Sequence, residues 1–282
     1  MRTTYDGLIR MDFMLKDNKT VATKLYREGN FRISSSIPLN NHIAYYFIIS
    51  TGGGYTEGES YFQEVKLQSG SHVILTTQTP NYIFKCENNI PTTHNNVIYI
   101  GNEAVLEYYM DDTIPYADSL YIQSTEVLME KGSKLILTDG LTSGWDPDDR
   151  LFKYSRVELK LNIKKSNKLI LNDLLLVDPK ENLMFELGYF EGKNNFNSVV
   201  IIDENINLEI VKQLNRYMKN IITKSVFGIT LLEEGGIVFR VLGYSSYDNH
   251  HLMSLFIDYY RQNILNCESI QLRKSDYFNL GE

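Results

Sequence analysis

The feature that most constrains the fold is a succession of short apolar runs, separated by turn residues, from the N-terminus to about Ile202. Glycine, asparagine, aspartate and serine separate the runs, and these residues accept left-handed or turn backbone. We predict strands at residues 8–15, 20–27, 31–33, 43–50, 60–67, 72–77, 97–100, 120–129, 134–138, 157–164, 168–177, 183–190 and 198–202. Many short runs at close spacing indicate a mainly β fold.

The aromatic content supports this prediction, because 20 tyrosines and 13 phenylalanines dominate the aromatic 12% of the chain. Wide side chains of this kind pack well on pleated, half-buried strand surfaces. A length of 282 residues is compatible with two domains of about 150 residues each. No proline- or serine-rich linker divides the chain, however, so we expect residues 1–282 to form a single domain.

Two segments near the C-terminus have helical periodicity instead. In residues 206–224 and 247–265, apolar side chains recur at three- and four-residue steps, which predicts two α-helices. Asn205 or Asn207 is available as the first N-cap, and Ser246 or Asp248 as the second. Between the two helices, residues 226–232 and 237–242 predict a hairpin.

An internal repeat links two distant parts of the β region. Residues 64–76 are similar to residues 126–138, and both copies contain a Gly-Ser turn between two apolar runs. We interpret the repeat as a hairpin used twice, stacked layer on layer so that each copy covers the apolar face of the other. Chance similarity between two hairpins is the alternative.

The net charge of −7 disfavours non-specific binding to nucleic acid or to an anionic membrane. No apolar run approaches the roughly 20 residues that span a bilayer, and the N-terminus lacks the apolar segment of a secretory signal. We therefore expect a cytoplasmic protein with no nucleic-acid or membrane partner. In that compartment Cys86 and Cys267 are expected to be unpaired thiols.

No motif for catalysis is present. The five histidines accompany no catalytic serine or cysteine motif, and the glycine-rich stretch from residue 52 to residue 58 lacks the Lys-Ser/Thr of a phosphate-binding loop. His250 and His251 open the second predicted helix, where we expect surface exposure. These observations favour a binding or scaffolding protein over an enzyme. A β-rich carbohydrate-binding or carbohydrate-active protein, with surface tyrosines as stacking platforms, remains an alternative.

Three ordered blocks nevertheless resemble the urease accessory protein UreD family, called UreH in some organisms. The first block has a glycine pair, a Gly-acid pair and a Leu-Thr-Thr-Gln run, the second has Leu-Glu-Tyr before Ile-Pro, and the third has Arg-x-Leu-Gly-x-Ser. The matching residues include Gly53, Gly54, Gly58, Thr76, Thr77, Gln78, Glu107, Pro115, Gly243 and Ser245. Glu59 stands where the family usually has aspartate, Tyr82 where many members have lysine, and Gly144-Trp145 in place of a common Gly-Arg.

The resemblance implies a single elongated, helicoid-like stack of strands and hairpins with two α-helices near the C-terminus. It also implies a non-enzymatic maturation chaperone, which binds the urease structural subunits together with the accessory proteins UreF and UreG and delivers nickel to the urease active site.

No tightly bound cofactor is implied, only nickel in transit through a polar interior passage. By position the resemblance maps this passage onto Glu59, Asp139 and Asp173. Oxygen ligands hold a divalent cation loosely enough for handover. A tether that assembles the partners without guiding metal is the remaining alternative.

Overall fold

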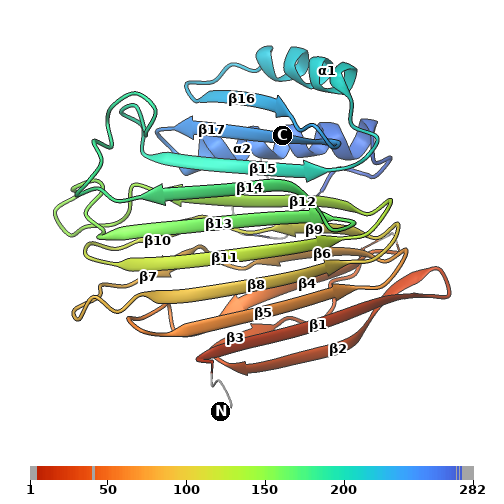
Figure 1. Cartoon of the computed structure of the whole chain (residues 1–282), viewed down its shortest axis with the longest axis horizontal. Coiled ribbons are helices and arrows are strands. Elements are labelled where there is room, and N and C mark those ends of the chain that lie inside the picture. Colours follow the sequence, from red (N-terminus) through yellow and green to blue (C-terminus); the bar gives the residue numbers. More distant parts are fainter. Residues whose placement is uncertain (1–4, 40–41, 271, 273, 275–282) are drawn as a thin grey trace.

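The computed structural model describes residues 5–39, 42–270, 272 and 274, and shows a mainly β molecule with two helices in its C-terminal part. The strands wind into a β-solenoid of about four turns. In Figure 1 the winding progresses from β1 and β2 at one end to β15, β16, β17 and the helices at the other. The predicted mainly β, elongated fold with two late helices is confirmed.

One wall of the solenoid is a seven-stranded sheet, called sheet A here. Its order is β14 (Lys168–Val177), β13 (Arg156–Lys165), β11 (Leu120–Met129), β8 (Thr92–Ile100), β5 (Ser60–Leu67), β1 (Gly7–Lys16) and β2 (Lys19–Gly29). The strands from β1 to β13 pair in parallel, and antiparallel partners close both ends. Burial alternates along β1 and β5, because only one face of the sheet packs on the core.

The opposite wall is a ten-stranded sheet, called sheet B. Its order is β16 (Val226–Leu231), β17 (Gly236–Gly243), β15 (Asn195–Ile202), β12 (Lys134–Thr142), β9 (Val105–Tyr109), β6 (His72–Thr77), β4 (Ala44–Ser50) and β3 (Phe31–Ile33), with β7 (Asn81–Ile83) and β10 (Thr113–Pro115) attached at its side. Burial in β4 and β6 is nearly continuous, because both faces of this sheet are covered.

Two hydrophobic cores result from the two faces of sheet B. Tyr46, Leu75 and Leu106 point into the core between the sheets. Tyr45 and Ile74, their neighbours in sequence, point to the outer face and pack against helices α1 (Leu208–Lys219) and α2 (Ser246–Asn263). Figure 1 shows both helices at the C-terminal end of the molecule.

The two helices form close to their predicted positions. Asn207 is the N-cap of α1, as its position predicted, and its side chain accepts hydrogen bonds from the backbone N–H groups of Glu209 and Ile210. The predicted cap of α2 is wrong: Ser245 takes the N-cap position and makes no side-chain capping bond. The predicted hairpin forms as β16 and β17.

The hairpin interpretation of the internal repeat is wrong. The turn at Gly70 leads from β5 in sheet A to β6 in sheet B, and the turn at Gly132 leads from β11 to β12 in the same way. Each copy is therefore an arch across the core and not a paired hairpin. Both glycines have positive φ, +72° and +68°, which explains why glycine recurs there. The copies lie two turns apart, with β8 and β9 in the turn between them.

The predicted strand at residues 183–190 is also wrong, because this segment forms turns. Leu187 is 87% exposed and Gly188 has a φ of +86°. Met184 and Phe190 are buried in the core between the sheets, so the turns bury two separate side chains instead of the alternating set of a strand. The short strands β7, β9 and β10 were not predicted. The two cysteines are free, as expected, and no helix among the described residues is long and apolar enough to cross a membrane.

Candidate functional site

The inner face of sheet A changes from apolar to polar at one end of its strands. In β8 the inward positions Ile98 and Ile100 are apolar, whereas His94 and Asn96 are polar yet buried. The parallel register places Asn96 between Gln63 of β5 and Thr125 of β11. A row of buried polar side chains therefore crosses three turns of the solenoid.

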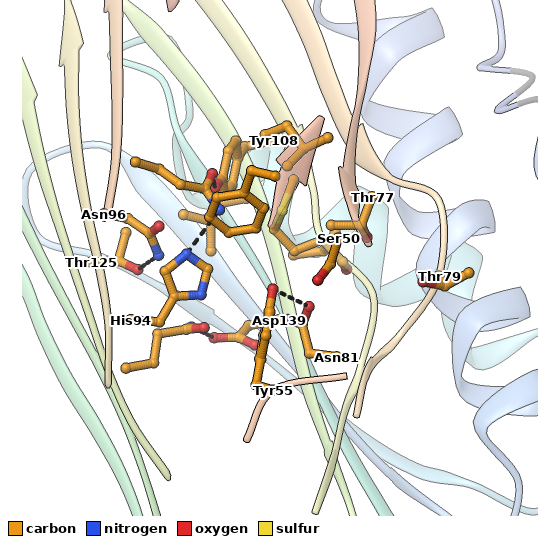
Figure 2. A pocket seen from close by; sticks show the side chains of 17 residues that line it. Ser50, Tyr55, Thr77, Thr79, Asn81, His94, Asn96, Tyr108, Thr125 and Asp139 are labelled. Carbon is orange, nitrogen blue, oxygen red and sulfur yellow. Dashed lines mark hydrogen bonds between the residues drawn. The ribbon is translucent and has the colours of Figure 1, made fainter. Parts of the chain in front are cut away.

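These side chains line a cavity inside the solenoid. Strands β9 and β12 of sheet B contribute Tyr108 and Asp139 to its wall, β7 contributes Asn81, and Tyr55 comes from the segment that forms a β-bridge with Ile83 of β7. About 30 Å³ is open to the centre of a water molecule, which is enough space to hold water. Figure 2 shows His94, Asn96 and Thr125 around this cavity together with Tyr108 and Asp139.

A continuous chain of hydrogen bonds runs through the cavity wall and ends at Asp139. Each bond joins heavy atoms 2.8–3.2 Å apart. In order, the chain comprises Tyr108, Gln63, His94, Tyr121, Gln123 and Asp139. Because these groups satisfy one another, their burial costs far less than the burial of unpaired polar groups would.

Burial favours the neutral forms of Asp139 and His94 in this series of hydrogen-bonded side chains. Burial is the largest cause that raises the pKa of Asp139, and the nearby charges of Asp112 and Asp173 add to it, while hydrogen bonds from Gly140 and Gln123 oppose the shift; the resulting pKa is about 7. Burial lowers the pKa of His94 to about 3, so its imidazole is neutral at neutral pH. A carboxyl group with a pKa near neutrality can exchange a proton for a cation.

One buried oxygen in the cavity wall lacks a partner within the described part of the chain. Asn96 Nδ2 donates to Thr125 Oγ1 over 3.0 Å, but Asn96 Oδ1 makes no hydrogen bond. The residue is only 5% exposed. A buried acceptor without a partner favours an additional polar ligand at this position.

The structure does not bring the three predicted passage residues together. Asp139 lines the cavity. Glu59 lies outside it and accepts hydrogen bonds from Tyr61 Oη and the backbone N–H of Thr56. Asp173 forms an ion pair with Arg240, at 2.7 Å, at the edge of sheet A.

Glu107, a residue of the second family block, is completely buried on the outer face of sheet B. It pairs with His72 and with Arg261 of α2, and it accepts a hydrogen bond from Tyr109. Burial alone would raise the pKa of Glu107, but the partners outweigh it, with His72 the largest contributor, and hold the pKa at about 2. The ionised carboxylate therefore anchors α2 to sheet B.

The other family-block residues are structural in their contacts. Thr76 donates to the carbonyl of Tyr109, and Thr77 donates to Asp111. Gly243 leaves room for Asn249. Gly53 and Gly58 are turn glycines with positive φ, and Gly54 packs against the backbone of Tyr82. The carbonyl of Pro115 accepts a hydrogen bond from the backbone N–H of Trp145. Gln78 lines a second pocket, and Ser245 is the N-cap of α2.

The expected surface exposure of His250 is wrong. His250 is 5% exposed and its Nε2 lies 2.9 Å from Asp112 Oδ1. The carboxylate of Asp112 explains the burial, because it compensates an imidazole that faces sheet B rather than solvent. His251, the next residue, is exposed as expected.

No group of three or more histidine, cysteine, aspartate or glutamate side chains among the described residues could hold a metal ion. The cavity instead presents single oxygen donors, such as Asn96 Oδ1 and the Asp139 carboxylate. Such an arrangement suits brief contact with a divalent cation rather than stable binding.

Our sequence-based predictions missed Gln63, His94, Asn96 and Gln123. Their signal is the substitution of polar for apolar residues at alternate positions of three neighbouring strands. That pattern becomes visible only once the parallel register aligns the strands, because each strand alone resembles one that is exposed to solvent.

The sequence is similar to those of known proteins over nearly its whole length. The model of the UreD urease accessory protein family matches residues 5–275. The urease accessory protein UreD of Streptococcus thermophilus (strain CNRZ 1066) is 37% identical over 276 residues, which cover 98% of this chain and 99% of the relative. The UreD of Lachnoclostridium phytofermentans is 32% identical, covering 86% and 89%, and that of Bacillus cereus is 29% identical, covering 95% and 98%.

Proposed function

Because the chain belongs to the UreD family of urease accessory proteins, we propose that its interior cavity forms part of the path by which nickel reaches urease. The chain is a non-catalytic chaperone with a role in nickel insertion during urease maturation. The carbohydrate-binding alternative is set aside, because the family match extends over nearly the whole chain.

The partners follow from the same membership. UreD proteins form complexes with urease and with UreF and UreG. We propose that this chain binds the urease structural subunits, UreF and UreG, and that it does so in the cytoplasm. The nickel ion is then cargo, which passes along the chain and does not remain as a cofactor.

The observation that carries the passage proposal is the polar cavity inside an otherwise apolar solenoid. Asp139 supplies a carboxylate there, and Asn96 supplies an oxygen without a partner. Oxygen donors replace part of the hydration shell of a cation without holding it firmly. We propose that Asp139 contacts nickel in the cavity and that Glu59 and Asp173 act outside it, where the ion enters or leaves.

A tether without a metal path is the second candidate, and it requires only a surface that binds other proteins. The turns between β14 and β15 expose Leu183, Phe185 and Leu187 by 71%, 57% and 87%. Clustered exposed apolar side chains mark surfaces that bind other proteins. Binding at this surface is compatible with both candidates, so only the fate of nickel separates them.

The first experiment deletes the gene and measures nickel in the purified urease. We expect urease subunits to be synthesised but to be poor in nickel and inactive. Nickel-replete urease in the deletion strain would contradict the role in maturation.

The second experiment restores a variant with Glu59→Gln, Asp139→Asn and Asp173→Asn together. We expect this variant to co-purify with its partners, while the nickel content of urease falls. Normal nickel content with an intact complex would favour the tether.

A further inference from the structure

His94 is the one imidazole on the described wall of the interior cavity. Imidazole nitrogen is a good ligand for nickel, better suited to it than neutral oxygen donors are. A neutral imidazole carries a lone pair on one of its two ring nitrogens. A lone pair that faced the cavity would retain a nickel ion.

The hydrogen bonds leave neither imidazole nitrogen free. His94 Nε2 lies 2.8 Å from Gln63 Nε2, and His94 Nδ1 lies 3.2 Å from Tyr121 Oη. All three side chains belong to sheet A and are nearly excluded from solvent, with at most 4% exposure. Gln63 therefore occupies the nitrogen that would otherwise be available to a ligand.

The donor and acceptor roles in this series of hydrogen bonds identify Gln63 as the group that covers the lone pair of His94. An ionised Asp139 accepts from Gln123, whose Oε1 accepts from Tyr121. The Tyr121 hydroxyl then accepts from His94 Nδ1–H, which leaves the lone pair on Nε2 to accept from the Gln63 amide. With both side-chain amides turned over, the hydrogen bonds would run the other way, and His94 Nε2–H would donate to Gln63 Oε1. Nε2 is occupied in both directions.

Three aromatic rings hold the imidazole in this orientation. The ring centroid of His94 lies 5.7 Å from that of Phe31, 5.9 Å from that of Tyr55 and 6.0 Å from that of Tyr61. Packing among rings at these separations restricts rotation. Loss of the Gln63 side chain would therefore leave Nε2 facing the space that the amide had filled.

We propose that Gln63 is a specificity-determining residue of the nickel path, which covers His94 so that no imidazole nitrogen is open to the passing ion. The inference rests on the proposed function of the cavity and adds to it a reason for low retention. A weakly held ion moves on, whereas an ion bound to an imidazole would stay.

The test measures nickel binding to the full-length chain carrying Gln63→Ala, by isothermal titration calorimetry. We expect the affinity for Ni²⁺ to rise by roughly tenfold or more, as direct ligation replaces a blocked nitrogen. X-ray absorption of the nickel-loaded variant should show scattering from an imidazole ligand, which the wild-type protein should lack. Gln63→Ser, which also removes the amide and opens the space beside Nε2, provides the same test if the alanine variant is unstable.

Two matched variants isolate the cause. Gln68→Ala removes an exposed glutamine from the end of the same segment and should leave the nickel affinity unchanged. Adding His94→Ala to Gln63→Ala should return the affinity to the wild-type value. Unchanged affinity in both Gln63 variants, or a gain that persists without His94, would overturn the proposal.

Separate experiments test the covering of His94 by Gln63 and the passage of nickel through the cavity. The covering is tested on the isolated chain, without urease, and an unchanged nickel affinity overturns that proposal alone. Normal nickel loading of urease by a chain with a blocked cavity overturns the passage, whatever the affinity of the Gln63 variants.

Discussion

At the scale of single residues, buried ion pairs connect sheet B to helix α2. Glu107 and Arg261 join sheet B to α2, and Asp112 and His250 do the same nearer the start of the helix. Removing one partner of such a pair leaves an uncompensated buried charge, which typically costs about 3–5 kcal/mol. These side chains therefore determine where α2 sits on the sheet.

The lowered pKa of Glu107 predicts a specific dependence of stability on pH. Because the folded-state pKa lies at about 2, below the ordinary glutamate value of 4.5, the ionised pair stabilises the folded state above pH 4.5 and this stabilisation is lost as the pH falls toward 2. The shift corresponds to a free energy on the order of 3 kcal/mol. Urea unfolding at pH 7 and pH 3 should show that Glu107→Gln is destabilising at pH 7 and much less so at pH 3.

The exposed Glu87 provides the control, since Glu87→Gln removes a carboxylate without breaking a buried pair. It should unfold like the wild-type protein at both pH values. An equal cost of Glu107→Gln at pH 7 and pH 3 would contradict the ionic account.

At the scale of elements, local periodicity was sufficient for most strands and for both helices. The alternation in residues 8–15 and 20–27 placed β1 and β2, and the apolar spacing around Leu214 placed α1. Periodicity could not say which sheet a strand joins, so the arch at Gly70 resembled a hairpin. It also misplaced a strand at residues 183–190, which form turns that expose Leu183, Phe185 and Leu187.

The polar cavity was beyond prediction for the same physical reason. His94 and Asn96 become neighbours of Gln123 and Thr125 only through the register of parallel strands, which local sequence does not specify. Asp139 was mapped by family position alone, and its place in the cavity wall comes from the structure.

A pair of strand glycines tests the close packing between β12 and its neighbours. A Cβ at Gly140 would overlap Asp112 Oδ1 and Asn197 Nδ2, whereas a Cβ at Gly228 would meet nothing within 4 Å. We expect Gly140→Ala to lower the free energy of unfolding by about 1–3 kcal/mol. Gly228→Ala should be neutral or stabilising by up to about 1 kcal/mol, because glycine is unfavourable within strands.

Denaturant unfolding of both variants measures this difference. Equal stability of Gly140→Ala and Gly228→Ala would show that the contact with Asp112 and Asn197 is not tight.

At the scale of the whole molecule, the two sheets share one continuous core. The core between them includes Ile9 of β1 as well as Val200 of β15. We propose on this basis that residues 1–282 form a single domain. Calorimetric unfolding of the full chain should show one transition, and two separable transitions would contradict a single domain.

The stacking of parallel strands in the solenoid also explains how a row of polar side chains can cross its apolar core. A parallel solenoid stacks equivalent positions, so one polar residue per turn creates a row that crosses several turns. Sheet A supplies such a row at Gln63, Asn96 and Thr125, while the rest of the core remains apolar. The polar row is thus a property of strand register rather than of any single metal-binding motif.

Two adjacent asparagines of β8 test most directly whether nickel passes through this cavity. Asn96 faces the cavity, whereas Asn95 is exposed on the opposite face of the strand. The measurement is the nickel content of urease matured with Asn96→Leu or with Asn95→Leu, after confirming that each variant binds its partners.

We predict that Asn96→Leu slows nickel delivery by about tenfold, equivalent to a barrier about 1.4 kcal/mol higher, because leucine fills the cavity and removes its free oxygen. Asn95→Leu should load urease normally. Wild-type nickel content with Asn96→Leu, in an intact complex, would contradict passage through the cavity.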